Sequence, residues 1–172
     1  MLTPTYLFLD FDGVTHPWGG VEDFRCLPLV ETVLREFSET RVVITSDWRM
    51  LFSIQKLVAR FSEDIRCRVV GATPHLLVKR GVDLRGLREK EARLWLSQHG
   101  ATNAPWLAID DAPGNWITRS RLILTDFKRG FTEEDAEAAR RLLTRLGNGS
   151  FREHDPPQAE GGWPHAVQRG AR

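Results

Sequence analysis

Four short apolar runs constrain the fold of this chain more strongly than any other feature of its sequence. They are continuous rather than alternating in polarity, which is typical of strands covered on both faces. A weaker fifth candidate is RCRVVGAT at residues 66–73. A largely buried sheet is therefore expected. The four strong runs are YLFLDF at residues 6–11, RVVIT at 41–45, PWLAID at 105–110 and RLILTD at 121–126.

Segments with helical periodicity lie between these runs. Residues 27–37 and 51–61 each place apolar side chains three and four positions apart, which gives one apolar stripe. A third helix is expected at residues 87–99, and a fourth begins near Thr132, which can form a capping box with Asp135. The alternation predicts an α/β fold with a single doubly wound, mostly parallel five-stranded sheet and helices on both faces.

The length of 172 residues suits one domain with a substantial core. We expect residues 1–147 to form it, because residues 148–172 are rich in Gly, Pro and charge and predict a flexible tail. A net charge of +1 lacks the basic excess of an electrostatic duplex binder. No apolar run resembles a signal peptide or spans a bilayer, so a cytoplasmic protein away from the membrane is expected.

Polar side chains follow the ends of three predicted strands. Because the carboxyl ends of parallel strands meet at one edge of a sheet, where ligands bind, these side chains should share one pocket. Clustered carboxylates repel one another unless a cation lies among them, and an all-oxygen site suits Mg²⁺. Gly13 permits the turn after the first strand. The strand-end residues are Asp10 and Asp12, then Thr45 and Ser46, then Asp110 and Asp111.

In their order, these motifs resemble the haloacid dehalogenase superfamily of phosphohydrolases. Its signature is Asp-x-Asp-Gly, a Thr or Ser closing the second strand, a Lys or Arg opening a helix, and a later acidic pair. Finer features resemble the compact phosphatase-like domains of Swiss Army Knife RNA repair proteins, over roughly residues 7–146. The similar segments are DFDGVT, VVITS, LAIDD, SDWR, GATP, REKEARLWL and LTDFKRGFT.

This resemblance implies an Mg²⁺-dependent phosphohydrolase with an aspartate nucleophile. Asp10 would attack phosphorus and form an aspartyl phosphate, and Asp12 would protonate the leaving oxygen and then activate water. The metal would be held by Asp10, Asp110 and the backbone carbonyl of Asp12. Asp111 would bind it directly or through water.

The cation of the third motif is either Arg88 or Lys90. Arg88 shares a helical face with Ala92 that should pack on the sheet, whereas Lys90 lies about 200° away and should face water. Helical spacing therefore favours Arg88, with Lys90 as the other candidate for phosphate or substrate binding. Together with Thr45 and the Ser46 amide, this cation would stabilise the phosphoryl oxygens.

The spacing of the motifs leaves no room for a large cap domain. Only 32 residues separate Asp12 from Thr45, and 42 separate Thr45 from Arg88. An uncapped site suits polymeric substrates, so phosphorylated RNA or DNA ends, or a nucleotide, are the expected substrates. Trp48 and Arg49 are candidate nucleotide contacts. A core or rim position explains Trp48 equally well, and Trp18, Trp106 and Trp116 are expected to be packing residues.

A noncatalytic phosphate-binding or regulatory module of the same fold is the alternative function. All four motif positions carry residues suited to catalysis, which favours the enzyme. Mg²⁺-dependent hydrolysis of an aryl phosphate would identify the enzyme. Binding of beryllium fluoride without hydrolysis would identify the module.

Overall fold

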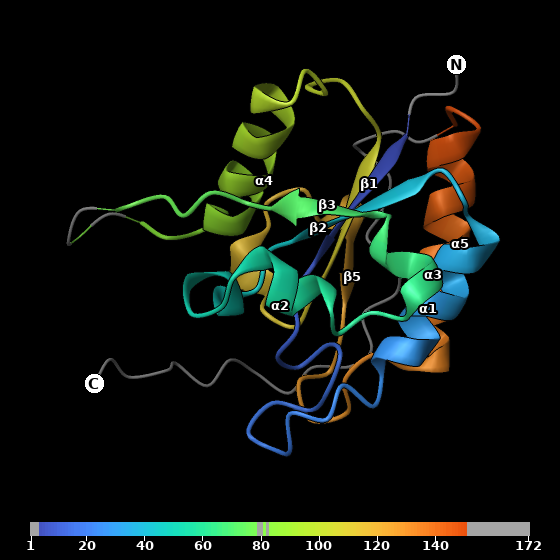
Figure 1. Cartoon of the computed structure of the whole chain (residues 1–172). Helices are drawn as coiled ribbons and strands as arrows, with labels where there is room; N and C mark the ends of the chain where they lie inside the picture. The colour runs from blue at the N-terminus through green and yellow to red at the C-terminus, as the bar shows by residue number, and fades with distance from the viewer. Residues whose placement is uncertain (1–3, 79–80, 82, 151–172) are drawn as a thin grey trace.

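The computed structural model describes residues 4–78, 81 and 83–150. Five strands form one sheet in the order β3-β2-β1-β4-β5, and every neighbouring pair is parallel. The predicted α/β class and five-stranded sheet are confirmed, and β1 lies at the centre (Figure 1). The strands are β1 (Thr5–Leu9), β2 (Thr40–Ile44), β3 (Val69–Ala72), β4 (Trp106–Asp110) and β5 (Leu122–Leu124).

Helices cover both faces of the sheet (Figure 1). Helices α1 (Leu27–Glu36) and α5 (Glu133–Gly147) contact each other on one face, and α4 (Leu87–Gln98) covers the other. The side chains of β1 alternate between the two layers: Leu7 joins the core with α1 and α5, and Phe8 joins the aromatic cluster under α4. The sheet is therefore doubly wound and buried on both faces, as continuous apolar strands require.

The helix predicted over residues 51–61 is shorter in the structure and covers only α2 (Ile54–Val58). A 3₁₀ turn, η1 (Asp47–Met50), precedes it, and α3 (Glu63–Arg66) follows. The Ser53 side chain caps α2 by accepting from the Lys56 N–H, so the helix begins after the first residues of the apolar stripe. Before α3, the Ser62 backbone N–H and hydroxyl both donate to the buried carboxylate of Glu31, at 2.7 and 2.6 Å.

Two helix boundaries match the sequence in detail. Gly100, just past α4, has φ +67, the left-handed conformation that favours glycine. Thr132 and Asp135 form the expected capping box at the start of α5, with Asp135 in the predicted reciprocal role. These local signals therefore fix where both helices begin or end.

Between β2 and α4, the described residues hold only η1, α2, α3, β3 and a connecting loop, so no large cap is present, as predicted. No described helix is both long and apolar enough to cross a membrane. Residues 151–172 of the predicted tail lie outside the described residues. The division at residue 147 stays a prediction.

Candidate active site

A cavity of about 370 Å³ lies where β1, β2 and β4 end at the carboxyl edge of the sheet. Polar groups from segments far apart in the sequence meet there, as the strand-end argument predicted. Both aspartates of the first motif and Asp111 of the last acidic pair face this cavity. Its lining residues are Asp10, Asp12, Trp18, Asp47, Arg49, His75, Leu87, Arg88, Glu91, Asp111, Ala112 and Asn115.

Asp10, Asp110 and Asp111 form a buried acidic cluster. Each offers one carboxylate oxygen, and these oxygens lie within 4.8 Å of one another. Burial, reinforced by the charge of Asp110, raises the pKa of Asp10 to about 7. Burial also raises the pKa of Asp110 to about 6. A divalent cation would offset this repulsion, and an all-oxygen donor set fits Mg²⁺.

The turn after β4 holds Asp110 in place. The backbone N–H of Ala112 donates to Asp110 Oδ1 at 2.7 Å, and Trp116 Nε1 donates to Oδ2 at 2.9 Å. The Asn115 amide lies 3.4 Å from Oδ2. Trp116 was predicted only to pack, and it is buried, but its polar edge also orients a carboxylate of the cluster. Sequence reasoning missed Asn115 and this role of Trp116, although both follow the acidic pair closely.

Gly13 allows the loop after β1 to approach Asp111. Its φ is +72, and a Cβ there would lie 2.5 Å from Asp111 Oδ2, closer than real side chains allow. The Thr125 hydroxyl donates to the Gly13 carbonyl at 2.7 Å and holds the loop from the β5 side. Gly13 therefore serves both the turn and the close packing of the acidic cluster.

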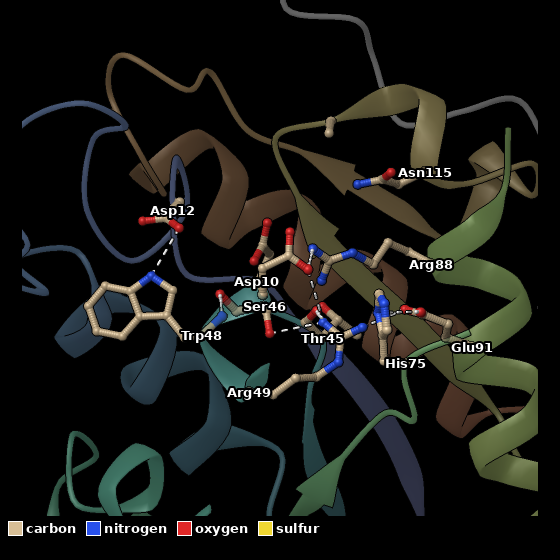
Figure 2. Close-up of polar contacts among 12 residues, drawn as sticks. Asp10, Asp12, Thr45, Ser46, Trp48, Arg49, His75, Arg88, Glu91 and Asn115 are labelled. Carbon is tan, nitrogen blue, oxygen red and sulfur yellow. Dashed lines mark hydrogen bonds and ion pairs between the residues drawn. The ribbon is translucent and has the colours of Figure 1, made fainter. Parts of the chain in front are cut away.

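The carboxylate of Asp12 stands apart from the acidic cluster. Trp48 Nε1 donates to Asp12 Oδ2 at 3.0 Å, and His16 Nε2 lies 3.0 Å from Oδ1. Figure 2 shows the Asp12 carboxylate facing the Trp48 indole, away from Arg88. The Asp12 side chain thus lines the cavity without belonging to the acidic cluster. The metal ligand predicted from Asp12 is its backbone carbonyl, and this role stays a prediction.

Thr45 and Ser46 follow β2 beside Asp10. Thr45 is fully buried, and within the described part of the chain its Oγ1 has no hydrogen-bond partner. The Ser46 side chain hydrogen-bonds Asp10, which opposes the rise in the Asp10 pKa. A buried hydroxyl without a partner is costly in a folded protein, so Thr45 Oγ1 marks a position suited to a ligand atom.

Arg88 is buried at the start of α4, whereas Lys90 is exposed, as helical spacing predicted. Arg88 Nη2 pairs with Asp47 Oδ1 at 3.0 Å, but among the described residues Nη1 has no partner. Burial opposes the charge of Arg88, yet the nearby carboxylates, Asp10 foremost, outweigh burial and raise its pKa. Arg88 thus offers the pocket a fixed positive charge with an unused donor.

Arg49 lines the cavity, but its guanidinium makes hydrogen bonds within the protein, so its role as a nucleotide contact stays a prediction. Its Nε donates to the Thr73 carbonyl at 3.1 Å, and Nη2 pairs with Glu91 Oε2 at 2.7 Å. Nη1 donates to the Thr45 and Ser46 carbonyls. Every nitrogen of the guanidinium therefore bonds within the protein. Arg49 joins the ends of β2 and β3 to α4 (Figure 2).

Trp48 and Trp18 differ in their exposure. Trp48 is 7% exposed and packs edge-on against Phe11 and Phe24, so the core interpretation describes it rather than the nucleotide contact. Trp18, interpreted from the sequence as a packing residue, is 53% exposed and lines the cavity. No local pattern distinguishes them, because exposure here depends on how the loop after β1 folds over the sheet.

Comparison with known families adds an independent finding. The model of a family described as the HAD domain in Swiss Army Knife RNA repair proteins matches residues 6–136. Searches of curated proteins and of solved structures found no match. The matched range holds the acidic cluster, Asp12, Thr45 and Arg88. The chain therefore belongs to the family of HAD domains of Swiss Army Knife RNA repair proteins, within the haloacid dehalogenase superfamily of hydrolases.

Proposed function

We propose that this chain is an Mg²⁺-dependent phosphohydrolase with Asp10 as its nucleophile. One observation carries the proposal: two buried donors near Asp10, Thr45 Oγ1 and Arg88 Nη1, have no partner in the part of the chain that the structure describes. Such donors destabilise a fold unless a ligand accepts their hydrogen bonds. A phosphoryl group supplies several acceptor oxygens, and its negative charge suits Arg88.

The acidic cluster suits the metal. Asp10, Asp110 and the backbone carbonyl of Asp12 would hold Mg²⁺, with Asp111 binding directly or through water. The bound ion would reduce the repulsion between the nucleophile and the phosphate. Ionised Asp10 is the form that attacks, and because burial and the charge of Asp110 raise its pKa, added positive charge would favour this form.

In the first step, an Asp10 oxygen attacks phosphorus, an aspartyl phosphate forms and the bond to the leaving oxygen breaks. Asp12 gives a proton to that oxygen, which departs as an alcohol. In the second step, the Asp12 carboxylate takes a proton from water as the water attacks phosphorus, which frees Asp10 and inorganic phosphate. Thr45 and Arg88 hold the equatorial oxygens throughout.

The open cavity favours a phosphorylated RNA or DNA end, or a nucleotide, as substrate. With no large cap over the site, a bulky chain can reach Asp10. Trp18 offers an exposed aromatic face within the same cavity, where a base next to the phosphate could stack. Trp18 would then provide the aromatic nucleotide contact for which Trp48 was a candidate.

Replacing Asp10 tests the proposal. Asp10→Asn keeps the shape of the side chain but removes the nucleophile, so hydrolysis of p-nitrophenyl phosphate with Mg²⁺ should stop while circular dichroism stays unchanged. Asp83→Asn is the matched control, because Asp83 is exposed and pairs with Arg85 away from the cavity. Retained turnover in Asp10→Asn refutes the assignment. Beryllium fluoride binding by an inactive wild type would favour the noncatalytic module.

A second assay addresses the substrate. Phosphate release should be compared for oligonucleotide 3′ ends, oligonucleotide 5′ ends and free nucleotides. We expect one of these classes to be preferred over p-nitrophenyl phosphate in kcat/KM, and Trp18→Ala to reduce that preference. Equal inactivity on all three classes would remove the nucleic-acid part of the proposal.

A further inference from the structure

Each carboxylate oxygen of Asp12 has a polar contact with a residue that the proposed mechanism leaves unused. His16 Nε2 contacts Oδ1 at 3.0 Å, and Trp48 Nε1 donates to Oδ2 at 3.0 Å. Both rings are buried, with 1% and 7% exposure, while the Asp12 side chain is 36% exposed toward the cavity. Buried side chains therefore hold the Asp12 carboxylate, and its exposed part remains accessible from the cavity.

The orientation of the His16 ring is fixed at its other nitrogen. Thr15 Oγ1 lies 3.2 Å from His16 Nδ1 and is itself held by the Phe11 carbonyl at 3.0 Å. Both ring nitrogens of His16 therefore have a polar neighbour, with Nε2 directed at Asp12. Rotation of the ring would break both contacts in a site that water does not reach.

The Trp48 indole is fixed by apolar packing instead. Its ring meets Phe11 at 5.9 Å and Phe24 at 5.4 Å, in edge-on arrangements of 82° and 86°. Phe24 also contacts the His16 ring, with centroids 5.0 Å apart. One aromatic cluster thus orients both polar groups that contact Asp12.

Without these contacts, Asp12 would have other partners in the cavity. It lies two residues from Asp10, and its carboxylate could turn toward Arg88 or a metal in the acidic cluster. A carboxylate engaged in that way could not deliver a proton to the leaving oxygen. We infer that His16 and Trp48 form an Asp12 clamp, two positioning residues that aim the carboxylate at the leaving group and keep it away from the metal; this inference rests on the proposed function.

The chemistry of the leaving group supplies a test that general loss of structure would not imitate. Nitrophenolate departs without a proton, whereas an alkoxide needs one. Because kcat/KM reports steps up to phosphoryl transfer, it excludes the later attack of water. For His16→Leu and Trp48→Phe, we expect kcat/KM to fall about 100-fold for an alkyl phosphate. For p-nitrophenyl phosphate the expected fall is below about threefold.

Two further variants sharpen the test. His16→Gln can place an amide nitrogen near the position of Nε2, so it should recover about tenfold of the alkyl phosphate activity lost in His16→Leu. Leu142→Val is the packing control: it changes the core at α5, leaves the His16 and Trp48 contacts to Asp12 in place, and should lower both activities by the same factor. Thermal unfolding identifies folded variants, and Trp48→Phe carries the test should His16→Leu not fold.

The outcomes separate the inference from the function on which it rests. Selective loss on the alkyl phosphate, with recovery in His16→Gln, supports the clamp. Equal loss on both substrates in His16→Leu and Trp48→Phe, or the same selectivity in Leu142→Val, overturns it while wild-type turnover stands. Turnover retained by Asp10→Asn instead rejects the proposed function itself.

Discussion

Arg49 and Arg88 line the same cavity and are both buried, yet they differ in how their donors are used. All three nitrogens of Arg49 bond to the protein, across the ends of β2, β3 and α4. Arg88 pairs through Nη2 with Asp47, and within the described residues its Nη1 has no partner. The difference indicates that Arg49 supports the fold, whereas Arg88 keeps a hydrogen-bond donor for a ligand.

The largest effect is expected on stability, when Arg49 is replaced. Arg49→Met leaves the carboxylate of Glu91, whose side chain is 2% exposed, buried without its guanidinium. Breaking a buried pair in this way costs about 3–5 kcal/mol in the free energy of unfolding. Urea denaturation measures it, with Arg88→Met as the matched control. If Arg49→Met loses no more stability than Arg88→Met, the structural role of Arg49 is contradicted.

Arg88→Met should act on catalysis instead. It removes a charged donor from the proposed phosphoryl site, and losing one such donor lowers turnover about 100- to 1,000-fold. Its partner Asp47 is 75% exposed, so little stability should be lost with the pair. Steady-state hydrolysis of p-nitrophenyl phosphate and thermal unfolding report the two effects. Lys90→Met, at the exposed alternative cation, should leave turnover near wild type.

Thr45→Val tests the second unsatisfied donor. The valine methyl replaces a buried hydroxyl that has no partner among the described residues, so the free energy of unfolding should stay the same or rise by up to about 1 kcal/mol. Turnover should fall about tenfold, because one hydrogen bond to the phosphoryl oxygens is lost. Lower stability together with unchanged turnover would show that the hydroxyl serves the fold.

The smallest effect expected is a dependence of metal binding on pH. The pKa values of Asp10 and Asp110, raised to about 7 and about 6 from 3.8, mean that the folded, metal-free protein retains protons that the unfolded chain releases. Its free energy of unfolding should therefore fall as pH rises from about 4 to 7. Mg²⁺ displaces these protons, so it should raise Tm by about 2–4 °C more at about pH 7.5 than at about pH 5.5. Equal shifts at both pH values would contradict the cluster as the metal site.

The sequence predicted those parts of the fold and site that depend on local pattern. Continuous apolar runs marked four of the five strands and a weaker run marked β3, and the parallel topology then placed Asp10 near Asp110 and Asp111. Helical spacing distinguished buried Arg88 from exposed Lys90. In each case a short stretch of chain, combined with one rule about strands or helices, determines where the side chain points.

Other features depend on side chains that meet across the fold, and local pattern does not reveal them. Arg49 bonds Thr73 and Glu91, which lie 24 and 42 positions away. Nothing in SDWR therefore distinguishes an arginine that joins the strands to α4 from one that contacts a substrate. Likewise, Trp48 reaches Asp12 across 36 positions. Ser62 bonds Glu31 across 31 positions, and the helix predicted over residues 51–61 covers only Ile54–Val58, a length that the apolar stripe does not mark.

The support that Thr125 gives to the Gly13 carbonyl spans 112 positions, and the Phe131 N–H adds a bond to the Val14 carbonyl at 2.7 Å. During translation, a chain that has left the ribosome only as far as β4 carries its acidic residues but lacks these braces for the first loop. The domain should therefore become active late, once the segment after β5 has emerged and formed its bonds to the loop after β1. A nascent chain would thus be held inactive until the domain is nearly complete.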